Sequence, residues 1–121
     1  MLIVYSSKTG NIERFLKKTV INSVLKIIDG SEKINEDFIL LTYTTGIGEV
    51  PTEVSSFMKN NFSKCKGLIG SGNKNWGGSF CNSVSLLYEQ YNLPILMRFE
   101  MSGNKQDLEK FLSVYVDFLN F

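Results

Sequence analysis

Three short segments of the chain combine glycine, hydroxyl and amide residues in a way that suits ligand binding. The first segment follows an apolar run, and its residues are Ser6, Ser7, Lys8, Thr9, Gly10 and Asn11. Backbone N–H groups at the start of a helix, joined by hydroxyl donors, favour a bound phosphate. The alternative is an ordinary turn in which Thr9 or Asn11 caps the helix. The sequence contains neither a P-loop nor a dinucleotide-binding fingerprint.

The second segment contains two glycines separated by a single residue. Its residues are Thr44, Thr45, Gly46, Ile47 and Gly48. Such glycines let the backbone approach a flat ligand closely, or let a peptide unit reorient. A plain turn is the alternative interpretation.

The third segment holds the only tryptophan of the chain, Trp76, among glycine and amide residues that include Asn73 and Gly77. A tryptophan in a polar, glycine-rich loop adds little to a core, so we interpret it as a stacking surface for a planar ring. The neighbouring backbone and amide groups could then bind the edge of a heterocycle. Alternatively, Trp76 folds back over the end of a helix.

Any chemistry at these segments proceeds without histidine, because the chain has none. This excludes Ser-His-Asp and Cys-His hydrolases, histidine-ligated metals and histidine acid–base catalysis, and we predict no metal site. The 13 basic and 12 acidic residues give a net charge of +1, which argues against a nucleic-acid partner.

The two cysteines, Cys65 and Cys81, are too far apart in sequence for a CxxC redox pair. We expect packed, reduced thiols in a cytoplasmic protein. Met1 leads directly into a strand-like run without the features of a leader peptide. No apolar run reaches the roughly 18 residues of a membrane span, so we expect no membrane partner.

The elements that position the three segments alternate along the chain. Apolar runs predict five strands, at Leu2–Tyr5, Val24–Asp29, Phe38–Tyr43, Cys65–Ser71 and Ile95–Glu100. Apolar residues at helical spacing predict helices within 12–20, 51–62, 80–91 and 108–119. The polar residues 30–37 are too few for a further helix. We therefore predict one α/β domain over residues 1–121, with parallel strands and helices on both faces.

Each of the three segments follows a predicted strand, so all three should lie at the carboxyl edge of the sheet. Ligands of open parallel sheets bind at this edge, where the strand order reverses. Together the segments suit a ligand with a phosphate at one end and a planar ring at the other. FMN is the cofactor of that shape commonly found at such a site.

The same segments resemble the NrdI proteins, which are small flavodoxin-like proteins of bacterial class Ib ribonucleotide reductase systems. The resemblance is carried by Ser7–Asn11, Thr42–Thr45, Ser71–Gly77 and Pro94–Gly103, and it covers essentially the whole chain. Its most specific part is the Ser-Gly-Asn-Lys-x-Trp-Gly stretch. It implies a flavodoxin-like three-layer sandwich with a five-stranded parallel sheet of order 2-1-3-4-5.

The resemblance also implies a function on a bound FMN. Reduced FMN would react with O₂ to give superoxide, and a reductase would serve as the electron donor. Superoxide would pass to the radical-bearing small subunit of the reductase system, oxidise its dimanganese centre and lead to a tyrosyl radical. The chain would then be a redox accessory flavoprotein rather than an enzyme with its own organic substrate.

Residue by residue, the resemblance assigns phosphate binding to Ser6, Ser7, Thr9, Gly10 and Asn11, with Lys8 either adding a charge or pointing to solvent. It assigns one side of the flavin ring to Thr44, Thr45, Gly46, Ile47 and Gly48, and the other side to Asn73, Trp76 and Gly77. The second segment has no aromatic residue, so the stacking partner on the Ile47 side stays open.

Charges in the three segments, Lys8 and Lys74 against Glu49, predict that a reduced, anionic flavin is less disfavoured here than in an acidic flavodoxin. Two other functions remain possible. The first is a generic flavodoxin that shuttles electrons, and the second is an interaction module without flavin.

Overall fold

The computed structural model describes residues 1–19, 21–45, 48–73 and 81–119. The strands are β1 (Leu2–Tyr5), β2 (Val24–Lys26), β3 (Phe38–Tyr43), β4 (Cys65–Gly72) and β5 (Ile95–Glu100). The helices are α1 (Asn11–Lys17), α2 (Thr52–Asn61), α3 (Asn82–Tyr91) and α4 (Lys105–Leu119), with a short 3₁₀ helix at Phe62–Lys64. Within the described residues, none of these helices has the length and apolar character needed to cross a membrane.

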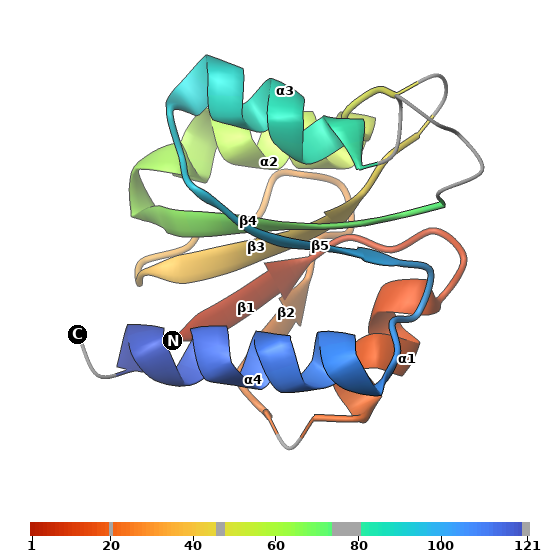
Figure 1. The fold of residues 1–121 in the computed structure, drawn as a ribbon. Coiled ribbons are helices and arrows are strands. Elements are labelled where there is room, and N and C mark those ends of the chain that lie inside the picture. The colour runs from red at the N-terminus through yellow and green to blue at the C-terminus, as the bar shows by residue number, and fades with distance from the viewer. Residues whose placement is uncertain (20, 46–47, 74–80, 120–121) are drawn as a thin grey trace.

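The five strands form one parallel sheet in the order β2-β1-β3-β4-β5. Helices α2 and α3 cover one face of the sheet, and α1 and α4 cover the other (Figure 1). The predicted α/β class, strand order and three-layer arrangement are therefore confirmed. The chain runs outward from β1 to β2 and then returns to β3 on the other side of β1. The order of the sheet thus reverses between β1 and β3.

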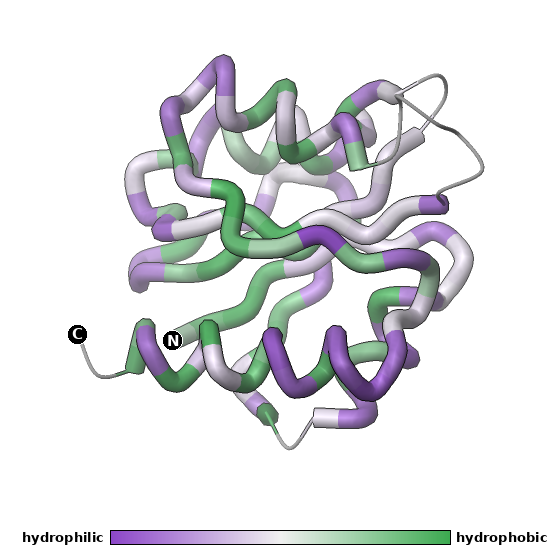
Figure 2. Tube along the Cα trace, in the orientation of Figure 1, coloured by the Kyte–Doolittle hydropathy of each residue, from purple (hydrophilic) through white to green (hydrophobic). Residues whose placement is uncertain are grey.

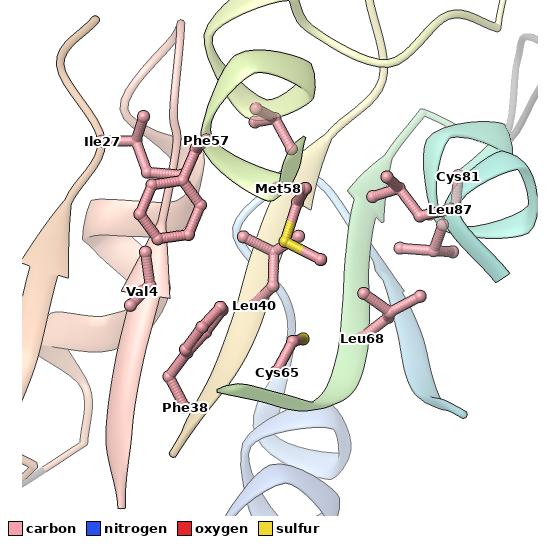
Figure 3. Packing of buried hydrophobic residues seen from close by; sticks show 12 residues of the cluster. Val4, Ile27, Phe38, Leu40, Phe57, Met58, Cys65, Leu68, Cys81 and Leu87 are labelled. Carbon is pink, nitrogen blue, oxygen red and sulfur yellow. The ribbon is translucent and has the colours of Figure 1, made fainter. Parts of the chain in front are cut away.

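The central strands are apolar because helices bury them on both sides. All of β3 except its last residue is buried, and Figure 2 shows green, hydrophobic stretches in the middle of the sheet. On the α2–α3 face, Phe57 and Met58 of α2 point onto Val4 and Leu40 of the sheet (Figure 3). On the opposite face, the rings of Phe15 and Phe99 stack at 4.2 Å between centroids. Two packed faces hold the carboxyl ends of the strands in place.

The edge strand β2 is shorter than predicted, because it ends at Lys26 rather than at Asp29. The backbone N–H of Ile27 still donates to the carbonyl of Tyr5 in β1, at 2.7 Å. The next N–H groups, beginning with that of Ile28, donate instead to the carboxylate of Glu32. Because these N–H groups bond to a nearby carboxylate, they are not available to extend β2 along the sheet. The apolar run in the sequence did not indicate this.

The helix limits also differ from the prediction by a few residues. Pro51 occupies the N-cap position of α2 rather than its first turn. Helix α1 ends at Lys17, and α3 begins at Asn82. Val20 and Phe80, which belonged to the predicted helical patterns, lie outside the described residues.

Candidate functional site

A cavity of about 460 Å³ lies beyond the carboxyl ends of β1, β3 and β4. This volume is typical of sites for small-molecule cofactors. Eight residues predicted from the sequence line it: Ser7, Lys8, Thr9, Asn11, Thr44, Thr45, Gly48 and Asn73. Five further lining residues were not predicted: Tyr43, Ser71, Gly72, Cys81 and Met101. Gly46, Ile47, Trp76 and Gly77, which were also predicted for the site, lie outside the described residues.

The first segment forms a turn centred on Gly10, which occupies the N-cap position of α1 with a φ of 82°. This left-handed conformation is strained for residues with a Cβ. Among the residues that the structure describes, no side chain caps α1, so the alternative in which Thr9 or Asn11 caps the helix is wrong. Arg14 braces the turn instead, donating to the Thr9 carbonyl at 3.3 Å and to the Asn11 side chain.

Ser6 occupies a different position from its neighbours in the first segment. Its side chain is buried, and its hydroxyl donates to Oε2 of Glu53 on α2. Ser6 is not among the described residues that line the cavity, whereas Ser7 is. The structure therefore places Ser6 behind the first segment, where it connects the end of β1 to α2.

The second segment is closed by a pair of backbone hydrogen bonds between Thr45 and Glu49, at 2.9 and 2.7 Å. Gly48 lies within this turn at a φ of 85°, which accounts for a glycine there. The side chain of Asn82, at the start of α3, donates to the Gly48 carbonyl at 2.7 Å. The turn is thus fastened to α3 as well as to β3.

The third segment is described as far as Asn73. The hydroxyl of Ser71 donates to the Met101 carbonyl at 2.7 Å, and the Met101 N–H donates to the Gly72 carbonyl at 2.7 Å. Met101 has a φ of 55°, and its exposed fraction is 48%. These two bonds hold an exposed thioether side chain at the wall of the cavity. Only the tertiary structure brings the end of β5 to this position, which is why the sequence did not indicate it.

A carboxylate, Glu53, lies directly behind the cavity wall. Its Oε2 atom accepts hydrogen bonds from the hydroxyls of both Ser6 and Tyr43, the latter at 2.8 Å. Partial burial would raise the pKa of Glu53, but the hydrogen bonds outweigh it and the pKa lies below its ordinary value. Burial and the Glu53 carboxylate raise the pKa of Tyr43 to about 12. At neutral pH the site therefore holds an ionised Glu53 and a protonated Tyr43.

Sequence reasoning missed Glu53 because it counted charges only in the three segments. Glu53 is in the first turn of α2, two residues beyond Pro51, and that turn lies over the ends of β1 and β3. The count of Lys8 and Lys74 against Glu49 therefore understated the negative charge near the cavity. A carboxylate in the first turn of a helix that follows a ligand-binding loop is the signal that could have indicated it.

Cys81 lines the cavity but is fully buried, at the N-cap position of α3. Its Sγ lies 3.8 Å from the carbonyl oxygen of Phe99. Burial raises the pKa of the Cys81 thiol to about 12, so the group is a neutral thiol at physiological pH. Cys65 is also buried, so both thiols are packed, as predicted.

A parallel sheet of order 2-1-3-4-5, with a cavity walled by hydroxyl and glycine residues beyond β1, β3 and β4, defines a flavodoxin-like protein. A model of the family described as "NrdI Flavodoxin like" matches residues 3–113, and the chain belongs to this family.

Among solved structures, a short-chain flavodoxin associated with a PDU bacterial microcompartment shares the fold with a TM-score of 0.70. The two chains are 21% identical, and the match covers 91% of each. At this level of identity the likeness shows the shared fold alone.

Proposed function

We propose that this chain binds FMN in the cavity beyond β1, β3 and β4 and activates a class Ib ribonucleotide reductase. The observation that carries the proposal is the meeting of the three segments around one cavity in a member of the NrdI flavodoxin-like family. The wider setting expected from the sequence belongs to the same proposal. It comprises a bacterial cytoplasm, a reductase as electron donor and the radical-bearing small subunit as partner.

The residues of the cavity fit a phosphate at the end formed by the first segment. Ser7 and Thr9 supply hydroxyl donors there, and Lys8 supplies a positive charge. None of the described residues that line the cavity is acidic, although the Glu13 carboxylate shares a hydrogen bond with the Ser7 side chain from outside this lining. Gly10 allows the turn that brings this set of donors together.

The residues of the second and third segments fit a flat, partly polar ring. Gly48 exposes backbone without a side chain, while Thr45 and Asn73 offer polar groups at the same wall. The buried Cys81 thiol adds an uncharged surface, and Met101 covers part of the rim. This arrangement would exclude water from the ring while leaving its edge accessible to polar contacts.

When bound, FMN supplies the redox chemistry, including the reduction of O₂ to superoxide for the dimanganese centre of the partner subunit. The protein holds and orients the cofactor, and the neutral thiol of Cys81 adds no charge beside it. A generic electron shuttle would use the same cavity, so the two functions differ in what accepts the electrons.

Two measurements test the proposal. The first is an absorption spectrum of the purified chain with added FMN, followed through anaerobic reduction; a chain that takes up no FMN would overturn it. The second mixes the reduced, loaded chain with the dimanganese small subunit and O₂, and records the tyrosyl radical by electron paramagnetic resonance. We expect the tyrosyl radical to form faster than with free reduced FMN and O₂. Radical formation no faster than with free reduced FMN would favour the electron shuttle.

A further inference from the structure

The Glu53 carboxylate joins the two strands between which the order of the sheet reverses. Ser6 belongs to the end of β1 and Tyr43 to the end of β3, and both hydroxyls donate to Oε2 of Glu53. Ser6 lies 47 residues before Glu53 in the sequence, and Tyr43 lies 10 residues before it. Glu53 is thus held at the switch point of the sheet, where a ligand of this fold binds.

These hydrogen bonds determine which polar groups Tyr43 can offer to a ligand. Its hydroxyl proton is directed to Glu53, so the phenolic oxygen has only lone pairs left to offer. Tyr43 lines the cavity, and a ligand group that meets its oxygen must therefore donate. A phosphate oxygen cannot donate unless it is protonated, whereas a sugar-alcohol hydroxyl can. Glu53 thereby favours a phosphate position beside Ser7 and Thr9, away from Tyr43.

The negative charge of Glu53 also acts on the phosphate itself. The Ser6 hydroxyl donates to Glu53. Ser6 directly precedes Ser7, which lines the cavity. A carboxylate so close to the first segment repels an anion, and the cations at this segment, Lys8 and Arg14, offset the repulsion only in part because both are exposed to solvent. The first segment therefore binds phosphate more weakly than its donors alone would allow.

We propose that Glu53 is a positioning and selectivity residue, whose charge limits how strongly the cavity prefers a phosphate-bearing flavin over the same flavin without phosphate. This inference rests on the proposed function for its ligand. It differs from a purely structural role, because a brace would support both ligands equally. The ratio of the two affinities separates these roles.

The test compares FMN with riboflavin, which lacks the phosphate, by quenching of flavin fluorescence on the full chain. Glu53→Gln removes the charge while keeping a side chain that can accept hydrogen bonds from Ser6 and Tyr43. We expect the ratio of the riboflavin Kd to the FMN Kd to rise roughly five- to tenfold in low salt, and the gain to shrink in high salt. A ratio within twofold of the wild type, or a ratio that falls, would overturn the proposal.

Two further variants control for charge and for geometry. Glu89→Gln removes an exposed carboxylate on α3, and we expect a wild-type ratio. Glu53→Asp keeps the charge but shortens the side chain, and we expect its ratio to stay near that of the wild type. If Glu53 were only a brace, Glu53→Asp and Glu53→Gln would weaken the binding of FMN and riboflavin by similar factors, and neither variant would change the ratio. Should Glu53→Gln fail to fold, Glu53→Ser removes the same charge with a residue that suits a first helical turn.

A second readout keeps this inference distinct from the proposed function. If the wild-type chain binds neither flavin, the FMN proposal fails, and inorganic phosphate becomes the probe. Phosphate binding is then followed through the amide resonances of Ser7 and Thr9. We expect Glu53→Gln to lower the phosphate Kd severalfold, and an unchanged Kd would overturn the role of Glu53.

Discussion

The hydroxyl of Thr44 accepts a hydrogen bond from the backbone N–H of Ser83 at 3.1 Å, across 39 residues of sequence. The same hydroxyl donates to the Ser83 side chain at 3.0 Å. Thr44 begins the second segment and Ser83 lies in the first turn of α3, so one side chain holds two walls of the cavity together. Residues at the ends of elements, rather than in the core, therefore maintain the shape of the site.

Thr44→Val should destabilise the protein by about 1–3 kcal/mol, because it leaves the N–H of the buried Ser83 without its acceptor. Urea denaturation of the two proteins measures this difference. Ser83→Ala is the matched control, since it removes only the hydroxyl contact and leaves the N–H bonded to Thr44. An equal loss in both variants would contradict the importance that we assign to the backbone donor.

Replacing Ser7 and Thr9 together by alanine should weaken FMN binding by about 10- to 100-fold, because two phosphate donors are lost at roughly 0.7–1.4 kcal/mol each. Riboflavin binding should change far less, since riboflavin has no phosphate. The paired replacement of Ser55 and Ser56, which are exposed on α2, controls for the loss of two hydroxyls. Equal losses for FMN and riboflavin would place the phosphate elsewhere.

Gly10→Ala should cost about 1 kcal/mol of stability and weaken FMN binding severalfold, because a Cβ is strained at a φ of 82°. The new Cβ would also lie 3.0 Å from the guanidinium of Arg14, which braces the turn. Gly10→Asn is the informative comparison, since asparagine tolerates the left-handed region. Thermal unfolding and FMN titration should place Gly10→Asn between the wild type and Gly10→Ala; the reverse order would exclude backbone strain as the cause.

Loss of the Tyr43 hydroxyl proton at high pH should break its hydrogen bond to Glu53 and lower the free energy of unfolding. Burial and Glu53 raise the folded-state pKa of Tyr43 from 10.0 to about 12. The unfolded chain therefore loses this proton first, and the contribution of Tyr43 to stability is complete below pH 10 and declines between pH 10 and 12. Tyr43 is partly exposed, so solvent screening limits the change to about 1 kcal/mol or less.

The measurement compares the free energy of unfolding of the wild type and of Tyr43→Phe at pH 9 and pH 11. The variant lacks the ionising group but keeps the ring, so all other alkaline effects are common to both proteins. We expect the advantage of the wild type to be smaller at pH 11. A constant advantage would show that Tyr43 keeps an ordinary pKa, and a growing one that its folded-state pKa is lowered; either result would contradict the prediction.

Both cysteines should resist thiol reagents in the folded protein. Cys65 and Cys81 are buried, and burial raises the pKa of each thiol to about 12. At pH 8 we expect labelling of the native protein to be at least about 100-fold slower than in urea, with Cys81→Ser reporting on Cys65 alone. Rapid labelling of Cys81 in the folded state would mean that the cavity wall opens.

The strands could be predicted from the sequence because their apolar runs follow from local burial. The runs at Leu2–Tyr5 and Phe38–Tyr43 have the same limits in the structure as in the prediction. β2 was predicted too long, because the capture of its N–H groups by Glu32 depends on how the chain bends.

The position of the site was predictable, since loops after parallel strands share one edge of the sheet. The individual partners were less predictable. Ser6 and Ser7 are adjacent and chemically identical, yet the first contacts Glu53 and the second lines the cavity, because successive side chains leave a strand end on opposite sides. Cys81 and Met101 become part of the wall only through tertiary packing.

The turn held by Glu32 has a consequence for how molecules of this protein meet. It limits β2 to three residues, so the outermost strand offers few unpaired backbone groups to another chain. The carboxylate occupies the N–H groups that would otherwise continue this edge. A second copy therefore finds little template for extending the sheet at β2, and this side of the molecule is protected from edge-to-edge aggregation.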